Sequence, residues 1–254
     1  MWLWLFARTF RLPVHLGNAV ALFLTAWLIY LADRLTDASS LSPGSPRSLR
    51  QAFCLRHREI WISALLLIAG FDLYVIWRYI DAGTFFAGAV VGLLALVYLV
   101  VNHPRGLIWR SLPAKEIVVG LLFAAGTLVA LRSSITTPFA ASALAFACLC
   151  SLNCISIAYW ERELDRAQKK ISVATRHPGF ARQAGRICGG LALASLLMAI
   201  VYRPAALIFG CVGASALLLA FLNALSRKID DDQRTALADL VLLTPILLLV
   251  VTAL

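Results

Sequence analysis

The chain has 254 residues, of which 61% are hydrophobic and 14% charged, and its mean hydropathy is +0.84. Soluble domains usually carry about a quarter charged residues, so this composition excludes a water-soluble enzyme and a disordered chain. The net charge of +10 does not indicate a nucleic-acid partner, because an excess of Lys and Arg in a membrane protein marks the cytoplasmic loops. A polytopic membrane protein in contact with membrane lipids is the class that remains.

Apolar segments of about 20 residues predict an all-α fold, a transmembrane helix bundle in one integral membrane domain over residues 1–254. About eight spans are expected, near residues 12–37, 58–78, 82–102, 113–132, 136–163, 184–202, 204–226 and 235–254. If the loop after the first span is cytoplasmic, 18 of the 23 Lys and Arg residues fall on that side. This asymmetry predicts the orientation and supports the number of spans.

Two cytoplasmic loops are much longer than the other connections. They run from Asp33 to Glu59 and from Glu161 to Arg186, and the first contains a Ser-, Pro- and Gly-rich stretch at 39–46 that favours irregular structure. Long loops on one face of a compact bundle usually carry function. We therefore expect the chemistry at the cytoplasmic face.

Each long loop begins with the same motif, an acid followed by Arg, two residues and Asp. The first motif contains Asp33 and Asp37, and the second contains Glu161 and Asp165. A spacing of four residues puts both carboxylates of a motif on one helix face. Both spans run in the same direction, so all four carboxylates reach the cytoplasmic face, where they repel one another unless a cation lies between them. Such hard oxygen donors, together with substrate phosphates, suit Mg²⁺.

A simpler interpretation of the motifs stays open. Each could be a helix end at the membrane surface, where its acids pair with Arg34, Arg162 or the arginines of the loops. Surface ion pairs of that kind contribute little to stability. The occurrence of two matching motifs at one membrane face favours a shared site over this interpretation.

The layout resembles the UbiA-like superfamily of intramembrane prenyltransferases, and the resemblance covers nearly the whole chain. In that family two Asp-rich motifs bind Mg²⁺ and an isoprenyl diphosphate, whose prenyl group passes to an aromatic or similar acceptor. The family's first motif reads Asn-Asp-x-x-Asp-x-x-x-Asp. Asp33 and Asp37 match its last two acids, whereas Ile29 and Tyr30 stand at the leading Asn-Asp positions. In the second motif Glu161 and Asp165 match, and Ala158 replaces a leading Asp.

The resemblance implies that Asp33, Asp37, Glu161 and Asp165 are the catalytic acids and the Mg²⁺ ligands. Further candidates for binding prenyl diphosphate or acceptor are Tyr30, Lys115, Asn153, Arg50 and Arg176. Lys115 precedes the fourth span, where the family often carries a basic pair. Asn153 lies two turns before Glu161 on one span, and the two arginines belong to the long loops. An integral protein of a bacterial inner membrane, with its acidic motifs facing the cytoplasm, is expected.

The family also normally has one helix before the span that carries the first acidic motif. The segment Met1–Arg8 therefore resembles the tail of such a helix, which predicts a native protein about 20–30 residues longer. An in-frame upstream stop codon without an apolar stretch would contradict this. Because half of each motif is missing, two other classes stay open: a membrane transporter, and a UbiA-like protein that binds isoprenoids or lipids without catalysis.

Two other acidic features receive structural interpretations. Asp72 lies inside the second span, and we expect it to pair with Arg78. The run at 230–232 consists of three aspartates and is interpreted as a solvated turn.

Overall fold

The computed structural model describes residues 1–41, 44, 46–101, 115–131, 135–225 and 229–246, and within these ranges it is helical and contains no strand. The long helices are α2 (Leu16–Ser39), α4 (Arg58–Tyr79), α5 (Ala82–Val101), α6 (Lys115–Leu128), α7 (Thr137–Trp160), α11 (Ala184–Val201) and α12 (Ala206–Ala224). The shorter helices are α1 (Trp2–Phe10), α3 (Leu49–Arg56), α8 (Arg162–Ala167), α9 (Val173–Arg176), α10 (Pro178–Arg182) and α13 (Asp231–Val241). Two 3₁₀ turns, η2 (Val129–Leu131) and η3 (Arg203–Ala205), complete the order.

Among the described residues, five helices are long and apolar enough to cross a membrane, which supports the membrane class predicted from composition. They are Leu16–Ser39, Arg58–Tyr79, Thr137–Trp160, Ala184–Val201 and Arg203–Ala224, and Ala82–Tyr98 forms a shorter apolar segment. The predicted spans near 113–132 and 235–254 correspond to shorter described helices, α6 and α13. Residues 102, 113–114, 132, 226 and 247–254, which belong to four of the predicted spans, lie outside the described residues.

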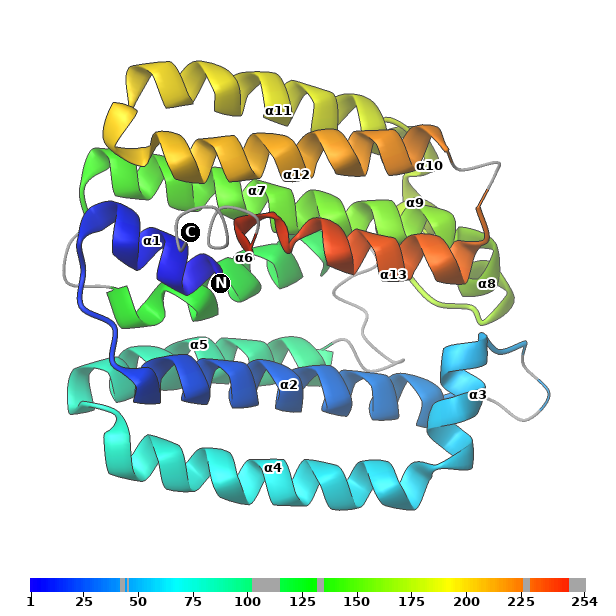
Figure 1. Ribbon diagram of the computed structural model, residues 1–254. Coiled ribbons are helices and arrows are strands. Elements are labelled where there is room, and N and C mark those ends of the chain that lie inside the picture. The colour runs from blue at the N-terminus through cyan, green and yellow to red at the C-terminus, as the bar shows by residue number, and fades with distance from the viewer. Residues whose placement is uncertain (42–43, 45, 102–114, 132–134, 226–228, 247–254) are drawn as a thin grey trace.

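The helices form two groups, seen as the upper and lower halves of Figure 1. The upper group contains α6, α7, α11 and α12, with α1 and α13 packed against them. Its large cores include the fully buried Phe6, Phe146 and Phe209. The lower group contains α2, α3 and α4, whereas α5, drawn close to α2 in this view, packs against α6 and η2. Between α2 and α4 only a small core is buried, around Ala21, Leu24 and Val75.

The N-terminal segment is not a loose tail. Residues Trp2–Phe10 form α1, and its apolar side chains enter the core of the upper group. The Trp2 ring stacks on Phe146 with ring centroids 4.4 Å apart, and the Trp2 indole N–H donates to the Leu242 carbonyl oxygen at 2.9 Å. Aromatic burial of this size holds a nine-residue helix in place, although such a helix is too short to be stable alone.

Both long loops are more ordered than their composition suggests. In the first, α2 continues through Ser39, and α3 begins at a capping box in which the Ser48 hydroxyl accepts from the Gln51 N–H and the Gln51 side chain accepts from the Ser48 N–H. This arrangement satisfies two backbone donors at a helix start. The second loop contains α8, α9 and α10. The irregular structure expected at 39–46 is confirmed for its described residues, of which only Ser39 is helical, while the helices lie in other parts of the two loops.

Asp72 has a different partner from the one expected. Its Oδ2 accepts a hydrogen bond of 2.7 Å from the Thr25 hydroxyl on α2, and the side chain is only 4% exposed. Arg78 instead lies over the Tyr79 ring. A carboxyl group buried between two helices takes the donor on the facing helix, so Asp72 joins α2 to α4.

Candidate functional site

The structure brings the two acidic motifs to the same end of the molecule, and we call their four carboxylates the acidic site. Asp33 and Asp37 lie in the last turns of α2. Asp37 Oδ1 forms an ion pair with Lys170 Nζ, and Asp37 Oδ2 accepts from Gln51 Nε2 at 2.9 Å. Among the described residues, Asp33 makes no hydrogen bond through its carboxylate, although Lys115 and Lys170 interact with it electrostatically.

The second motif crosses a helix boundary. Glu161 is the residue that separates α7 from α8, and Asp165 lies within α8. The Asp165 N–H donates to the Glu161 carbonyl at 2.9 Å, so the helical spacing predicted for the two acids continues across the boundary. Glu161 Oε1 forms an ion pair with Arg50 and accepts from the Thr235 hydroxyl at 3.2 Å.

Asp165 is the acid whose ionisation is most affected outside the membrane-spanning helices. Burial removes water from its carboxyl group and raises its pKa to about 6, although the Ser172 hydroxyl and the charge of Lys170 act in the opposite direction. The carboxylate form therefore predominates at neutral pH, but it is less well compensated than that of an ordinary surface aspartate.

The ion pairs of the site cross from one motif to the other. Arg50, in the loop after the first motif, pairs with Glu161 of the second. Lys170, in the loop after the second motif, pairs with Asp37 of the first. Gln51 and Gln168 add a hydrogen bond of 2.8 Å between the same two loops. These crossed contacts join the lower group of helices to the upper group at this end.

A further acid enters the site from α13. Asp232 Oδ1 accepts from Arg50 Nε at 3.2 Å, and Asp230 caps α13 by accepting from the Asp232 N–H. Asp231 pairs with Arg234, whose guanidinium lies over the Trp160 ring. The interpretation of 230–232 as a solvated turn was therefore wrong, because a helix starts there and one of its first residues neutralises Arg50.

A backbone motif at the end of α8 positions Lys170. The Lys170 N–H donates to the Asp165 carbonyl at 2.8 Å, and the Lys169 N–H donates to the Arg166 carbonyl at 3.0 Å. Lys169 has a left-handed conformation with φ of +56°. This is the arrangement of a Schellman helix end, with a Lys at the position that glycine usually occupies. The chain reverses here, so the residue after the turn starts beside Asp165.

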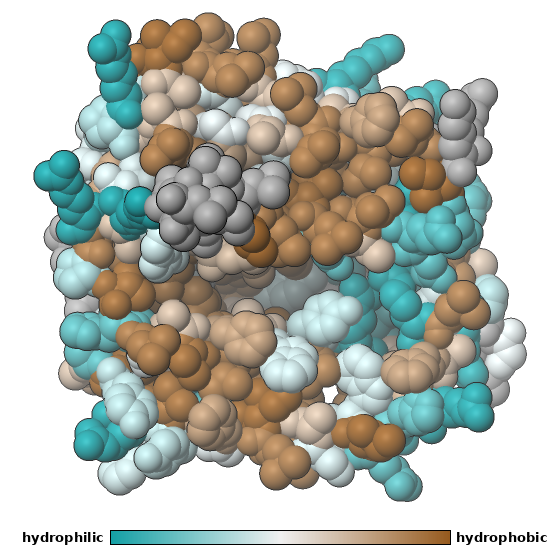
Figure 2. All heavy atoms as spheres, in the orientation of Figure 1, coloured by the Kyte–Doolittle hydropathy of each residue, from teal (hydrophilic) through white to brown (hydrophobic). Residues whose placement is uncertain are grey.

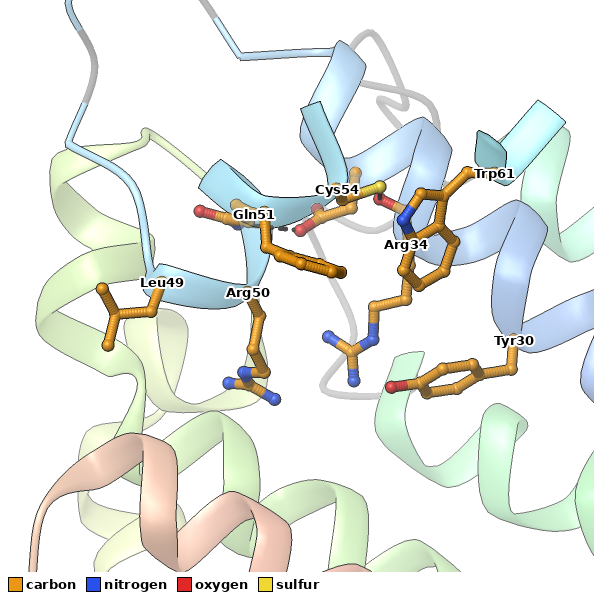
Figure 3. A pocket seen from close by; sticks show the side chains of 9 residues that line it. Tyr30, Arg34, Leu49, Arg50, Gln51, Cys54 and Trp61 are labelled. Carbon is orange, nitrogen blue, oxygen red and sulfur yellow. Dashed lines mark hydrogen bonds between the residues drawn. The ribbon is translucent and has the colours of Figure 1, made fainter. Parts of the chain in front are cut away.

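A cavity of about 400 Å³ adjoins the acidic site beneath α3. Figure 3 shows the guanidinium groups of Arg34 and Arg50 extending into it, with the hydroxyl of Tyr30 directed toward Arg34. The Arg34 guanidinium lies 5.1 Å from the centroid of the Tyr30 ring. The lining is otherwise mostly apolar or aromatic and comprises Tyr30, Arg34, Asp37, Leu49, Arg50, Gln51, Phe53, Cys54 and Trp61. Volumes of this size are typical of small-molecule sites.

The surface near this cavity changes from apolar to hydrophilic along its length. Figure 2 shows a hollow between the two groups of helices, with apolar side chains above and below it. Hydrophilic side chains gather at the right-hand end, where Figure 1 places α3 and α8. An amphiphilic molecule with one charged end matches a hollow of this kind.

The other predicted residues take different places. Lys115 opens α6 and interacts electrostatically with Asp33, Asp37 and Asp165. Asn153 is buried in α7, and its Oδ1 has no partner among the described residues. Arg176 ends α9, exposed to solvent. Tyr30 and Arg50 line the cavity. Among the described residues, neither Arg176 nor Asn153 has a contact with the acidic site.

Within the described residues, no group of three or more His, Cys, Asp or Glu side chains is close enough to hold a metal ion. Each motif alone supplies two carboxylates. Mg²⁺ in proteins is often held by one or two carboxylates, with substrate phosphates and water completing its shell. The chemistry of either pair therefore fits Mg²⁺ bound together with a phosphate ligand, and the assignment of all four acids as ligands stays a prediction.

Sequence reasoning missed most partners of the four acids. Gln51, Lys170, Thr235 and Asp232 all contact them directly or through Arg50. The capping-box sequence that starts at Ser48 predicts a helix in the first loop, and this signal could have been found. The pairing of Lys170 with Asp37 depends on two segments 133 residues apart, and no local pattern predicts it.

Comparison of the chain with protein-family models, with curated proteins and with solved structures finds no match.

Proposed function

We propose that the chain is a UbiA-like intramembrane prenyltransferase that transfers an isoprenyl group from a prenyl diphosphate to an aromatic or similar acceptor, with Mg²⁺ as cofactor. The observation that carries the proposal is the meeting of both acidic motifs with four basic side chains at one end of the bundle. These basic side chains are Arg34, Arg50, Lys115 and Lys170.

The charges of the site suit a metal diphosphate better than either ion alone. Asp37 is paired with Lys170 and Glu161 with Arg50, so binding a lone cation or a lone anion leaves one member of each pair without a partner. Mg²⁺ with diphosphate supplies a cation for the carboxylates and an anion for the ammonium and guanidinium groups. The internal pairs can therefore be replaced without leaving a buried charge uncompensated.

In this assignment Asp33, Asp37, Glu161 and Asp165 hold Mg²⁺, which would neutralise the charge on the leaving diphosphate. Arg50, Lys115 and Lys170 bind the phosphate oxygens. The apolar lining of the adjoining hollow holds the isoprenoid chain and excludes water from the carbon atom that loses its diphosphate. Tyr30, which lines the cavity, would contact the acceptor.

The proposed orientation follows from the distribution of basic residues. The loops that carry the acidic site also carry most of the Lys and Arg residues, which favours the cytoplasmic side. We infer that the protein lies in a bacterial inner membrane with the site facing the cytoplasm. Labelling of a cysteine introduced at Arg47, which is exposed in the first loop, in sealed inverted vesicles tests this orientation. Protection of that cysteine in inverted vesicles would contradict it.

The decisive experiment measures diphosphate release by the purified protein with prenyl diphosphates of several lengths and a panel of aromatic acceptors. Release is expected with Mg²⁺ and not with EDTA. Asp33→Ala and Asp165→Ala should each lower the rate at least about 100-fold, the loss typical when a group that stabilises developing charge is removed. Membrane insertion and elution during purification should remain unchanged. Unchanged release in both variants would reject the assignment.

Two alternatives give different results in the same preparation. A UbiA-like protein that only binds lipids would bind prenyl diphosphate with Mg²⁺ but release no diphosphate. The absence of the leading acids at Tyr30 and Ala158 favours this second candidate. A transporter would move a substrate across vesicle membranes without needing a diphosphate.

A further inference from the structure

Lys170 occupies a central position among the acids of both motifs. Its ammonium group forms an ion pair with Asp37. It also interacts electrostatically with Asp33 of the same motif and with Asp165 of the other. A single positive charge therefore already interacts with three carboxylates of the proposed metal site.

The backbone of Lys170 is fixed, whereas its side chain is long and flexible. The turn at the end of α8 holds its N–H on the Asp165 carbonyl, and three residues further on the Val173 N–H donates to Glu116 Oε1 at 2.9 Å. A Lys side chain has four rotatable carbons and a compact charge. The ammonium group can thus exchange one partner for another nearby without any movement of the helices.

We propose that Lys170 is an exchangeable internal counter-ion, which neutralises Asp37 in the absence of ligand and moves to a phosphate oxygen when a divalent cation takes its place. The inference rests on the proposed function and adds a rule for how the site is loaded. A divalent cation that binds alone must displace the Lys170 ammonium group from Asp37 without providing it with a new anionic partner. A cation that arrives with a diphosphate provides the displaced ammonium with a new partner, so the two ligands bind cooperatively.

The rule predicts effects of opposite sign for one substitution. Lys170→Met removes the competing charge but keeps a long side chain. Mn²⁺ alone should therefore bind to this variant at least about fivefold more tightly than to the wild type, which is the lower end of the coupling usually found between two binding sites. The same substitution removes a phosphate partner, so inorganic pyrophosphate in the presence of Mn²⁺ should bind at least about fivefold more weakly. Lys170→Arg keeps the charge and should return both affinities toward the wild-type values.

The experiment titrates the purified full chain with Mn²⁺, followed by the electron paramagnetic resonance of free Mn²⁺, and then with pyrophosphate at saturating Mn²⁺. Lys169→Met is the matched control, because the neighbouring Lys169 is exposed and makes no ion pair among the described residues. It should leave both affinities within about twofold of the wild type, since an isolated exposed charge contributes little. The opposite shifts in Lys170→Met, absent from Lys169→Met, would support the exchange.

The possible failures can be told apart. If the wild type binds Mn²⁺ with pyrophosphate but Lys170→Met binds Mn²⁺ alone no more tightly, the counter-ion role is overturned and the proposed function stands. If both affinities fall together in Lys170→Met, the side chain serves only to hold the loops in place, which also overturns the exchange. If the wild type binds no Mn²⁺ in the presence of pyrophosphate, the proposed function fails, and the exchange fails with it.

Discussion

The two acidic motifs have the same spacing but different surroundings. Asp33 and Asp37 lie in one uninterrupted helix, α2, whereas the chain between Glu161 and Asp165 passes from α7 into α8. The first motif is neutralised by a lysine from the loop after the second, and the second by an arginine from the loop after the first. Neither half of the site is therefore complete within its own group of helices.

The difference between the motifs shows how the site is assembled. The first motif lies within the continuous helix α2, so the position of this helix determines where the two carboxylates lie. The second ends in a turn, and this turn delivers Lys170 beside both motifs. Because the lower group of helices has only a small core of its own, the crossed contacts at this end determine how the first motif faces the second. Four substitutions test how the two motifs depend on these contacts.

The largest effect on ligand affinity is expected at Arg50. Arg50→Ala removes the cation shared by Glu161 and Asp232, and we expect the affinity for pyrophosphate with Mn²⁺ to fall at least about tenfold, because charge-assisted hydrogen bonds to phosphate are lost. The pair is partly exposed, so the free energy of unfolding should change by only about 1 kcal/mol or less. Isothermal titration calorimetry and thermal unfolding measure the two quantities.

Arg47→Ala serves as the control for Arg50→Ala, because Arg47 is an exposed arginine of the same loop. It should leave the affinity unchanged. An equal loss in both variants would mean that the loop acts through its general positive charge and that the crossed pair between Arg50 and Glu161 has no special role.

The next effect, on the free energy of unfolding, is expected at Glu116, which holds the segment after Lys170 in place through a hydrogen bond. Its buried Oε1 accepts from the Val173 N–H at the start of α9. Glu116→Ala leaves this buried donor without a partner and should lower the free energy of unfolding by about 2 kcal/mol. Glu116→Gln keeps an acceptor oxygen and a similar volume, so it should lose clearly less. Urea denaturation in detergent compares them, and equal losses would show that the contact is unimportant.

Asp165 should give the third effect, which depends on pH. Its pKa is about 6 in the folded protein, compared with 3.8 for an unperturbed Asp, so the folded chain binds this proton more tightly than the unfolded chain. Between these two values the unfolded state loses its proton first, and the free energy of unfolding falls as the pH rises, by about 3 kcal/mol. The cause is burial of the carboxyl group without enough positive charge around it.

Asp165→Asn separates this effect from the rest of the protein. The amide mimics the protonated acid, so the variant should be more stable than the wild type above pH 6 and equal to it near pH 4. We expect this gain in stability to accompany the loss of the proposed Mg²⁺-dependent activity, as is common for residues that serve function at a cost in stability. Equal unfolding curves at pH 7 would show that Asp165 is fully compensated in the folded protein.

The sequence predicted the parts of this site that depend on local spacing. Runs of apolar residues located α2, α4, α5, α7, α11 and α12, and the repeated acidic motif identified four carboxylates that the fold brings to one end. Local patterns could not predict the partners of those carboxylates, since Lys170 and Asp37 are 133 residues apart. The same limit applies to α1, which takes its stability from Phe146 and other distant residues of the core.

The smallest effect is expected at Lys169, where the turn that delivers Lys170 is strained. A non-glycine residue in the left-handed conformation costs about 1–2 kcal/mol, and glycine at this position of a helix end avoids that cost. Part of the gain is offset because glycine has more freedom in the unfolded chain. Lys169→Gly should therefore raise the free energy of unfolding by at most about 1 kcal/mol, measured by urea denaturation.

The same variant tests whether the turn needs its strain in order to function. If the geometry of the turn alone places Lys170, Lys169→Gly will bind Mn²⁺ and pyrophosphate as the wild type does, because the bond from the Lys170 N–H to the Asp165 carbonyl is retained. A weaker affinity for pyrophosphate in a more stable protein would show instead that the restricted backbone of Lys169 holds Lys170 toward the first motif. The turn would then be the structural difference that allows the second motif to complete the first.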